Sequence, residues 1–317
     1  MQPLNPQSSD NHHSTAVSTD SQYAEIFSKL TKWVKTLGRF MVFFATCGLL
    51  FTLCFYFFVT LPMMNTKMWT YLFHLVMGIY LTVGICFYYM KTVWTHPGSP
   101  TEEWICSNQH LQDTVSENGV IPITEMSKFW CQTCGKPKPP RAHHCHICQQ
   151  CILRMDHHCP WFNNCVGLQN YKYFLGFTFF MSLAADWNIF MILFGMMGIY
   201  DPEPILYQEW KGWLIFDLLL SVVVGIPLTF FTLFHSYLIF TNQSTIEFQF
   251  GRLVHIVRKI ETPYVNPYDM GIRINVQQIM GKSLILSDTW FELFAILLLL
   301  DPSPPESDGL TYPTNLS

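Results

Sequence analysis

The amino-acid sequence predicts an α-helical integral membrane protein, in which a cysteine-rich domain lies between the second and third of four transmembrane helices. Three observations predict this fold class. Half of the 317 residues are hydrophobic and only 13% are charged, whereas a soluble domain usually carries about 25% charged residues. Four apolar segments are long enough to cross a bilayer, and seven of the 11 cysteines fall between residues 131 and 165. The composition argues against a water-soluble enzyme and against a disordered chain.

The four apolar segments are the predicted membrane spans. A helix needs about 20 mainly apolar residues to cross the hydrocarbon core, and the segments that meet this length are Phe40–Leu61, Met68–Met90, Tyr173–Tyr200 and Trp213–Phe240. A buried core helix is the alternative for any one of them, but four in one chain favour a membrane. The first segment begins too far into the chain, and is too long, for a cleaved signal peptide.

The distribution of lysine and arginine predicts the orientation, because these residues collect in cytosolic segments. The two short loops hold one basic residue each, Lys67 and Lys211, and the other sixteen lie elsewhere. We therefore expect both termini and the middle loop in the cytosol. The predicted organisation is an N-tail (1–38), two spans (39–94), the cysteine-rich domain (95–172), two further spans (173–240) and a C-tail (241–317).

The two tails carry few structural signals. Residues 1–22 are polar and have no periodic pattern, so we predict that they are disordered. Thr289–Leu300 in the C-tail is apolar but too short to cross a bilayer. We predict an amphipathic helix there, lying against the membrane face.

The cysteine-rich segment has the spacing of a zinc domain. Structural zinc takes four thiolate or imidazole ligands, and two cysteines with two residues between them supply two of the four. Eight residues are candidate ligands: Cys131, Cys134, His144, Cys145, Cys148, Cys151, His158 and Cys165. Eight ligands suffice for two closed sites, so we predict a cytosolic two-zinc domain whose folding depends on the metal. Such clustering also indicates a reducing compartment rather than disulfides.

Cys159 is left over from this set of ligands. It follows Asp156, His157 and His158. A cysteine with a neighbouring histidine and aspartate has the parts of a nucleophilic triad, in which imidazole takes the thiol proton and carboxylate orients the imidazole. Because adjacent side chains of one helix or strand do not converge, we expect a metal-pinned loop. On spacing alone, Cys159 as a ninth ligand and Asp156 as a surface charge are the alternative.

Three classes of function fit a membrane-anchored zinc domain: an enzyme, an interaction module such as a RING-like ligase or adaptor, and a nucleic-acid binder. The loop 95–172 has six basic and six acidic residues, whereas a nucleic-acid site is clearly basic, so we expect no nucleic-acid partner. Cys159 with Asp156 and His157 favours the enzyme, because a scaffold needs no spare nucleophile.

The cysteine frame resembles the DHHC family of protein S-acyltransferases, or palmitoyltransferases. The resemblance rests on the tetrapeptide Asp156–Cys159 and on the cysteine spacing around it. The four spans match the family's topology, and further matching positions are Pro160, Trp161, Asn164, Gly167, Asn170 and Phe174. It covers about residues 24–282. The chain is therefore expected to be a protein-cysteine S-palmitoyltransferase.

The resemblance also implies roles for individual residues. One zinc would take Cys131, Cys134, His144 and Cys151, and the other would take Cys145, Cys148, His158 and Cys165. Cys159 would be the nucleophile, His157 its base and Asp156 the orienting group. The co-substrate would be palmitoyl-CoA, and the acceptors would be proteins with cytosolic cysteines near the bilayer. An endomembrane location, in the Golgi or endoplasmic reticulum, is expected rather than the plasma membrane.

Three basic residues among the zinc ligands are candidates for binding CoA. Lys136, Lys138 and Arg141 could meet the phosphates of the nucleotide, and a solvated loop surface is the alternative reading.

Two secondary motifs depart from the family pattern. The chain has His96-Pro97-Gly98 where the family usually has Asp-Pro-Gly, and Ser244-Thr245-Ile246-Glu247 where it usually has Thr-Thr-x-Glu. Thr245 and Glu247 match the pair that helps to hold the catalytic loop near the membrane. Residues 266–271, with Asn275 and Gly281, are similar to the family's C-terminal packing motif.

The acyl chain needs a hydrophobic slot between the spans. A 16-carbon chain is roughly 20 Å long, which matches about 13 helical residues at 1.5 Å each. Counted from Tyr173, the chain would end beside Leu183–Trp187, where Ala184 and Ala185 leave room if they face the slot. Asp186 should be neutral or hydrogen-bonded into the bundle rather than line the slot, because a carboxylate at this depth is costly.

Overall fold

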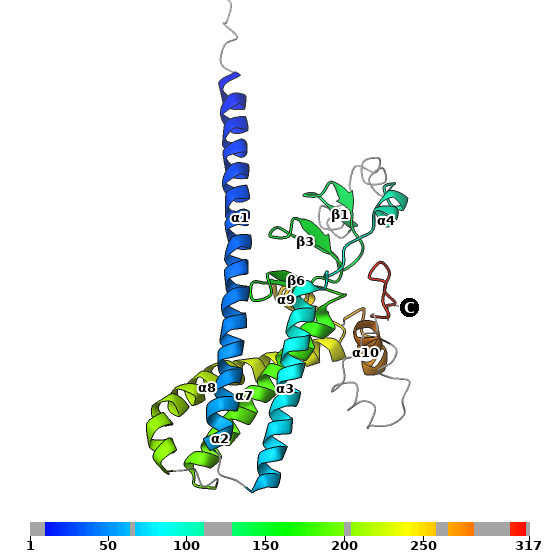
Figure 1. The fold of residues 1–317 in the computed structure, drawn as a ribbon. Helices are drawn as coiled ribbons and strands as arrows, with labels where there is room; N and C mark the ends of the chain where they lie inside the picture. The colour runs from blue at the N-terminus through cyan, green and yellow to red at the C-terminus, as the bar shows by residue number, and fades with distance from the viewer. Residues whose placement is uncertain are drawn as a thin grey trace, which may run out of the picture.

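Four long helices make up most of the described part of the molecule (Figure 1). The computed structural model describes residues 10–63, 67–110, 129–199, 204–257, 266–281 and 305–314. The long helices are α1 (Asp10–Phe55), α3 (Met68–Trp94), α7 (Tyr171–Met196) and α8 (Pro204–Phe240). A π-helical turn, η1 (Tyr56–Thr60), and a short helix, α2 (Leu61–Met63), continue α1.

The predicted membrane spans are confirmed. Among the residues that the structure describes, four stretches are long and apolar enough to cross a bilayer: Glu25–Met63, Met68–Trp94, Tyr171–Met196 and Gln208–Phe240. Each stretch contains the corresponding predicted segment, except that the third stretch ends at Met196 and leaves out Met197–Tyr200 of the prediction. The protein is thus a mainly helical, multi-pass membrane protein, and its cysteine-rich domain lies between the second and third spans.

Helix α1 is longer than the sequence predicted. It begins at Asp10, so the disorder predicted for residues 1–22 is wrong from Asp10 onward. A helix already nucleated by an apolar span can extend through polar residues, because each added residue contributes one further backbone hydrogen bond. The predicted amphipathic helix Thr289–Leu300 lies outside the described residues.

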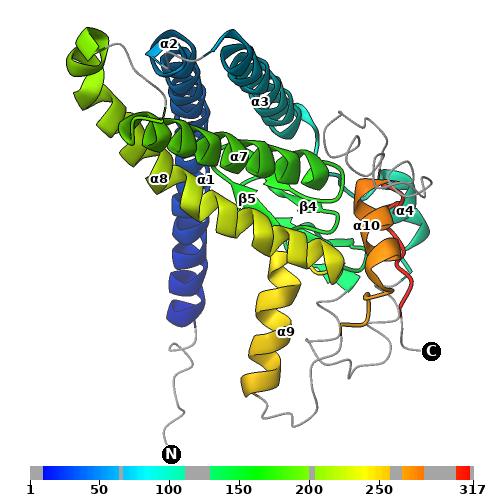
Figure 2. The same ribbon diagram turned by 90° about the horizontal axis from the view of Figure 1, so that it is seen from below.

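Helix α7 lies between α3 and α8 and packs on both (Figure 2). Small residues allow close approach of the helices. Gly84 and Gly176 lie directly against the rings of Phe180 and Tyr88, which join α3 to α7. Small residues let helix backbones approach where lipid supplies no hydrophobic driving force.

The cysteine-rich domain consists of three two-stranded antiparallel hairpins beyond one end of the bundle (Figure 1). The strand pairs are β1 (Trp130–Cys131) with β2 (Lys136–Pro137), β3 (His143–Cys145) with β4 (Gln150–Ile152), and β5 (His157–Cys159) with β6 (Asn164–Val166). Three short helices complete the described fold: α4 (Glu102–Ser107), α9 (Thr245–Val257) and α10 (Ile272–Met280).

Hydrogen bonds attach the hairpins, and the residue Gln169 just before α7, to the chain that follows α3. The Leu153 N–H donates to Gly98 O at 3.0 Å, and the Gln169 N–H donates to Pro97 O at 3.1 Å. The Asn164 side chain donates to Thr95 O at 3.0 Å, at the end of α3. These bonds place the third hairpin at the end of the helix bundle.

Candidate active site and metal centres

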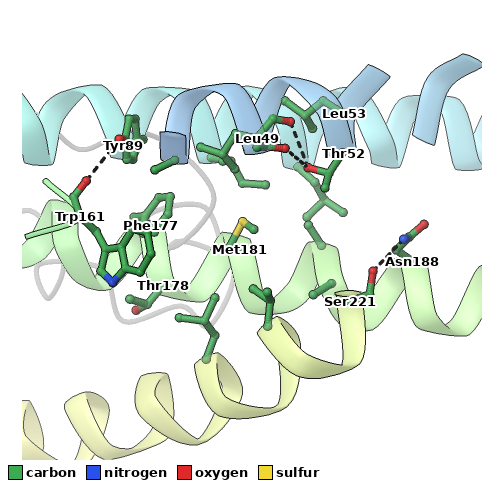
Figure 3. Close-up of a pocket in the computed structure, with 18 of the residues that line it drawn as sticks. Leu49, Thr52, Leu53, Tyr89, Trp161, Phe177, Thr178, Met181, Asn188 and Ser221 are labelled. Carbon is green, nitrogen blue, oxygen red and sulfur yellow. Dashed lines mark hydrogen bonds between the residues drawn. The ribbon is translucent and has the colours of Figure 1, made fainter. Parts of the chain in front are cut away.

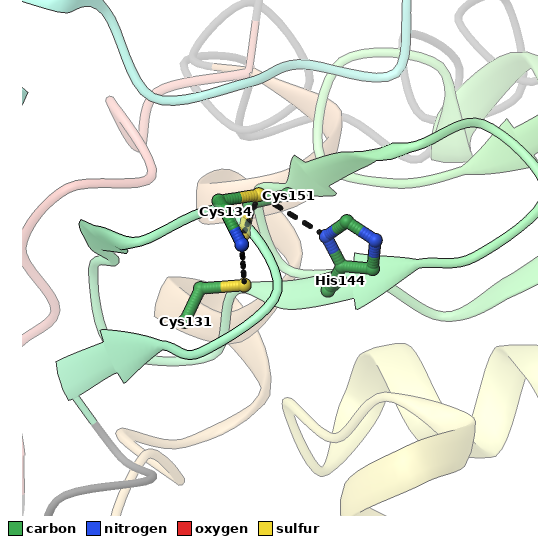
Figure 4. A group of neighbouring side chains, drawn as sticks. All are labelled: Cys131, Cys134, His144 and Cys151. Atoms are coloured by element: carbon green, nitrogen blue, oxygen red, sulfur yellow. Dashed lines mark hydrogen bonds between the residues drawn. The ribbon is translucent and has the colours of Figure 1, made fainter. Parts of the chain in front are cut away.

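Two groups of cysteine and histidine side chains converge within the hairpins. One comprises Cys131, Cys134, His144 and Cys151 (Figure 4), and the other comprises Cys145, Cys148, His158 and Cys165. In each group the four donor atoms lie within 4.8 Å of one another. These are the two sets that the family resemblance implied.

The distances suit a tetrahedral ion. Zinc–sulfur bonds of about 2.3 Å in a tetrahedron put two sulfurs about 3.8 Å apart. The Sγ atoms of Cys134 and Cys151 are 3.8 Å apart, and those of Cys148 and Cys165 are 3.4 Å apart. Three thiols and one imidazole in each group form a closed donor set, typical of structural rather than catalytic zinc.

Strand geometry separates the two groups. Successive side chains of a β-strand point to opposite faces. His144 of β3 pairs across the hairpin with Cys151, so the two side chains lie on the same face and both belong to the first group. Cys145, the next residue of β3, points to the other face and belongs to the second group. A single hairpin thus contributes ligands to both groups without mixing them.

The same alternation frees the nucleophile. In β5, His158 pairs across the hairpin with Cys165, and both belong to the second metal group. His157 and Cys159, two residues apart, then share the opposite face. The metal-pinned loop predicted for this segment is therefore wrong, because strand period two brings His157 and Cys159 together while turning His158 away from them.

Asp156 is a buried carboxylate with three hydrogen bonds. Its Oδ2 lies 2.7 Å from His157 Nδ1. The backbone N–H of Thr245 donates to Oδ1 at 2.7 Å, and the Thr245 hydroxyl donates to Oδ2 at 2.8 Å. Burial alone would raise the pKa of Asp156, but its bonds to His157 and Thr245 hold that pKa below the usual range. Asp156 therefore stays ionised and fixes the His157 ring.

His157 lies between this carboxylate and Cys159. Burial alone would lower its pKa, but hydrogen bonds with Asp156 and Cys159 raise it to about 9. The ring also makes an edge contact with Phe174 of α7, with centroids 5.2 Å apart. The three side chains thus form a connected series from carboxylate to imidazole to thiol.

A mainly apolar cavity of about 600 Å³ opens beside Cys159 and runs between the helices (Figure 3). Trp161 and Tyr89 line one end, and Asn188 and Ser221 line the opposite end. Cys159 lines the cavity in one buried cluster with Tyr89. Along α7 the lining extends from Phe174 to Asn188, which is about 21 Å at 1.5 Å per residue. The cavity is therefore about as long as a 16-carbon chain.

The cavity lining includes Ala184 and Ala185, as the count from Tyr173 predicted. Asp186 is absent from the described lining. Its carboxylate accepts a hydrogen bond from Thr229 of α8 at 3.2 Å. The bond was predicted, but Asp186 is exposed on the helix surface rather than buried in the bundle.

Comparison with known proteins identifies the family. The family model for the DHHC palmitoyltransferase matches residues 124–251. Palmitoyltransferase ZDHHC15A of Danio rerio is 29% identical over 76% of this chain and 72% of its own length. The probable protein S-acyltransferase 12 of Arabidopsis thaliana is 31% identical over 64% of this chain and 67% of its own length.

The chain belongs to the DHHC palmitoyltransferase family. It is therefore a protein S-acyltransferase.

The structure accounts for the two departures from the usual motifs of DHHC palmitoyltransferases. The His96 ring nitrogen Nδ1 accepts the Gly98 N–H at 3.1 Å, so the imidazole closes the turn that an aspartate would close. Ser244 and Glu247 form a capping box at the start of α9. The Ser244 N–H donates to Glu247 Oε2 at 2.8 Å, and the Glu247 N–H donates to Ser244 Oγ at 3.2 Å.

Glu247 also ties α9 to the zinc-ligand region. It accepts two bonds from Arg141, at 2.6 and 2.8 Å. Arg141 donates further to the side chain and backbone of Asn242, and its guanidinium lies over the rings of both Tyr268 and Tyr312. Burial alone would raise the pKa of Glu247, but attraction to Arg141 lowers it. The pair joins the metal region to the C-tail.

The three candidate CoA-binding residues differ in their surroundings. Lys136 is exposed and pairs with Glu102 at 2.9 Å. Lys138 donates to Ala142 O at 3.1 Å, and Arg141 is buried among the partners described above. Binding of CoA by these residues stays a prediction.

Sequence reasoning missed two buried residues that connect the site to the membrane helices. Arg154 is 1% exposed, donates to Gln243 O at 2.9 Å and lies over the ring of Tyr171. Asn242 binds Arg141, Tyr268 and Gln278. A charged residue among apolar neighbours was the signal at Arg154, whereas nothing local distinguished Asn242.

Thr245→Val should slow acyl transfer by this DHHC palmitoyltransferase while leaving its metal content unchanged. The substitution keeps the backbone bond to Asp156 and removes the hydroxyl bond, which to a charged acceptor is worth about 1.5–3 kcal/mol. We expect a roughly 10-fold or greater loss of rate. Thr245→Ser is the matched control because it restores the donor, and equal rates for the valine and serine variants would contradict this role.

Proposed function

We propose that the protein moves a long-chain acyl group, palmitoyl, from acyl-CoA onto Cys159 and then to a cysteine of a membrane-associated protein. One observation carries this proposal. Cys159 shares a strand face with His157, belongs to neither metal group, and lines an apolar cavity long enough for a 16-carbon chain.

The first half-reaction loads the enzyme. His157 accepts the thiol proton, and the Cys159 sulfur attacks the carbonyl carbon of the acyl-CoA thioester. A new carbon–sulfur bond forms, the bond to the CoA sulfur breaks, and the CoA thiolate takes the proton from His157. Asp156 keeps the His157 ring oriented throughout, and the apolar cavity holds the acyl chain out of water.

The second half-reaction repeats these steps with a protein thiol. A cysteine of the acceptor gives its proton to His157 and attacks the thioester on Cys159. The acyl group passes to the acceptor, and Cys159 leaves as a thiolate that recovers the proton. Because Cys159 lies where the third hairpin meets the helix bundle, the acceptors would be cysteines close to the bilayer.

The two cysteine–histidine groups would hold zinc, which would supply folding energy to hairpins that have little apolar core. Because the two short loops hold only Lys67 and Lys211 of the 18 basic residues, the hairpins and both termini would face the cytosol. The endomembrane location, in the Golgi or endoplasmic reticulum, is part of the same proposal.

Cys159→Ser should abolish acyl loading and transfer and leave two metal ions per chain. The serine hydroxyl is a far weaker nucleophile than a thiolate, and Cys159 is outside both metal groups. Acyl-enzyme formation and metal content are to be measured on the same purified sample. Loss of metal from this variant would assign Cys159 as a ligand and remove it as the nucleophile.

Cys148→Ser should lower the metal content from two ions to one, since Cys148 belongs to one group alone. A strong chelator should remove both ions and expose the hairpins to protease. The spans should stay protected because their backbone hydrogen bonds are internal to each helix. Hairpins that resist protease after chelation would show that the metal is not structural.

Ala184→Phe should shift donor preference toward shorter acyl chains without stopping turnover. Ala184 lines the cavity, whereas Ala185 lies tightly against Gly225 and cannot be enlarged without displacing α8. Filling the slot should disfavour the 16-carbon donor relative to a 12-carbon donor by roughly 10-fold or more, since one methylene of fit is worth about 1–3 kcal/mol.

The control for this measurement is Leu183→Phe. Leu183 lies one position earlier on the same helix, is exposed at the helix surface and is absent from the described lining. Competition between the two donors gives the ratio for each variant. The same ratio in the Ala184 variant, the Leu183 variant and the wild type would place the acyl slot elsewhere.

A further inference from the structure

A second histidine lies beside the proposed catalytic residues Asp156, His157 and Cys159 and is not one of them. His235, near the end of α8, is 1% exposed. Its ring centroid is 6.2 Å from that of His157. Asp156 and His157 of the catalytic series, and also Arg154, are close enough to interact with it electrostatically. A buried imidazole at this place is able to act on the catalytic histidine.

His235 is held by one polar partner. Its Nδ1 lies 2.8 Å from the hydroxyl of Tyr171, the first residue of α7. This bond sets the rotation of the imidazole, whichever of the two atoms donates. Tyr171 is itself fully buried, and its ring lies under the guanidinium of Arg154, 5.1 Å from the ring centroid.

The rest of the His235 ring is enclosed by aromatic side chains. Its centroid is 4.3 Å from that of Phe231 and 5.0 Å from that of Phe174. Phe174 in turn makes an edge contact with His157. His235 therefore contacts the phenyl ring that supports His157, in addition to lying next to His157 itself.

We propose that the Tyr171–His235 pair is a positioning element for His157. Asp156 fixes the Nδ1 edge of the catalytic ring through a hydrogen bond, and Phe174 with His235 confines the ring from the membrane side. Thr245 anchors the first support, and Tyr171 anchors the second. His157 is thus held from two directions by residues of three separate helices, α7, α8 and α9.

This inference rests on the proposed role of His157 as the base, and it assigns no proton transfer to His235. Removing the Tyr171 hydroxyl would free the His235 ring to rotate and Phe174 to shift. A displacement of a catalytic group by about 1 Å can reduce a rate by about 100-fold. Binding of acyl-CoA should be affected less than turnover, because neither Tyr171 nor His235 belongs to the described cavity lining and Phe174 lines only the end beside Cys159.

The test compares single-atom and side-chain variants in the full-length protein in lipid nanodiscs, with palmitoyl-CoA as the probe. Tyr171→Phe should lower kcat for loading of Cys159 about 10- to 100-fold, with KM within about twofold and the metal content unchanged. His235→Phe should behave likewise. His235→Asn keeps a hydrogen-bonding group near the Nδ1 position and should recover most of the lost rate.

Tyr173→Phe is the matched control, since it removes the same atom from the same helix two residues further on and should keep the wild-type kcat. A wild-type kcat in Tyr171→Phe would overturn the proposal. So would a loss explained by raised KM or by lost metal, which would show a structural role only. A different variant tests the proposed function itself. If His157 is not the base, His157→Ala will load Cys159 at the wild-type rate, whatever the Tyr171 and His235 variants do.

Discussion

The alternation of side chains along one short strand is the constraint on which the rest of the site depends. In β5, His158 turns toward a metal group, so His157 and Cys159 must turn away from it together. The ligands on the hairpin hold this register, because slipping by one residue would exchange the two faces. One geometric rule thus separates a metal-ligating imidazole, His158, from the reactive thiol and its base within three consecutive residues.

Buried polar contacts then join the hairpins to the chain that follows the last membrane helix, α8. Asp156 binds Thr245 at the start of α9, and Arg141 binds Glu247 two residues further on. Buried charges are stable only when they are paired and hydrogen-bonded, so these bonds position the hairpins on the helix ends with little tolerance. The same contacts bring Cys159 to the mouth of the apolar cavity. Metal binding, the carboxylate contacts and the cavity therefore depend on one another.

Hydropathy and local spacing predicted the spans and the eight candidate ligands, because both signals lie within short stretches of sequence. The partition of ligands came from the family resemblance alone. The sequence analysis did not predict the strands. Each strand has only two or three residues and carries metal ligands, so it is too short to show an alternation of hydrophobic and polar residues. The contact of Asp156 with Thr245 joins residues 89 positions apart, and the polar start of α1 has no apolar period. Neither could be seen without the folded chain.

The central claim is that Cys159 carries the acyl group. The most direct measurement incubates the purified, metal-loaded protein with palmitoyl-CoA labelled in the acyl chain, then maps the label by peptide mass spectrometry before and after hydroxylamine. The account predicts one hydroxylamine-labile palmitoyl group on the peptide that contains Cys159, formed without any acceptor protein. A label on another cysteine, such as Cys47 or Cys106, with Cys159 unmodified, would contradict it.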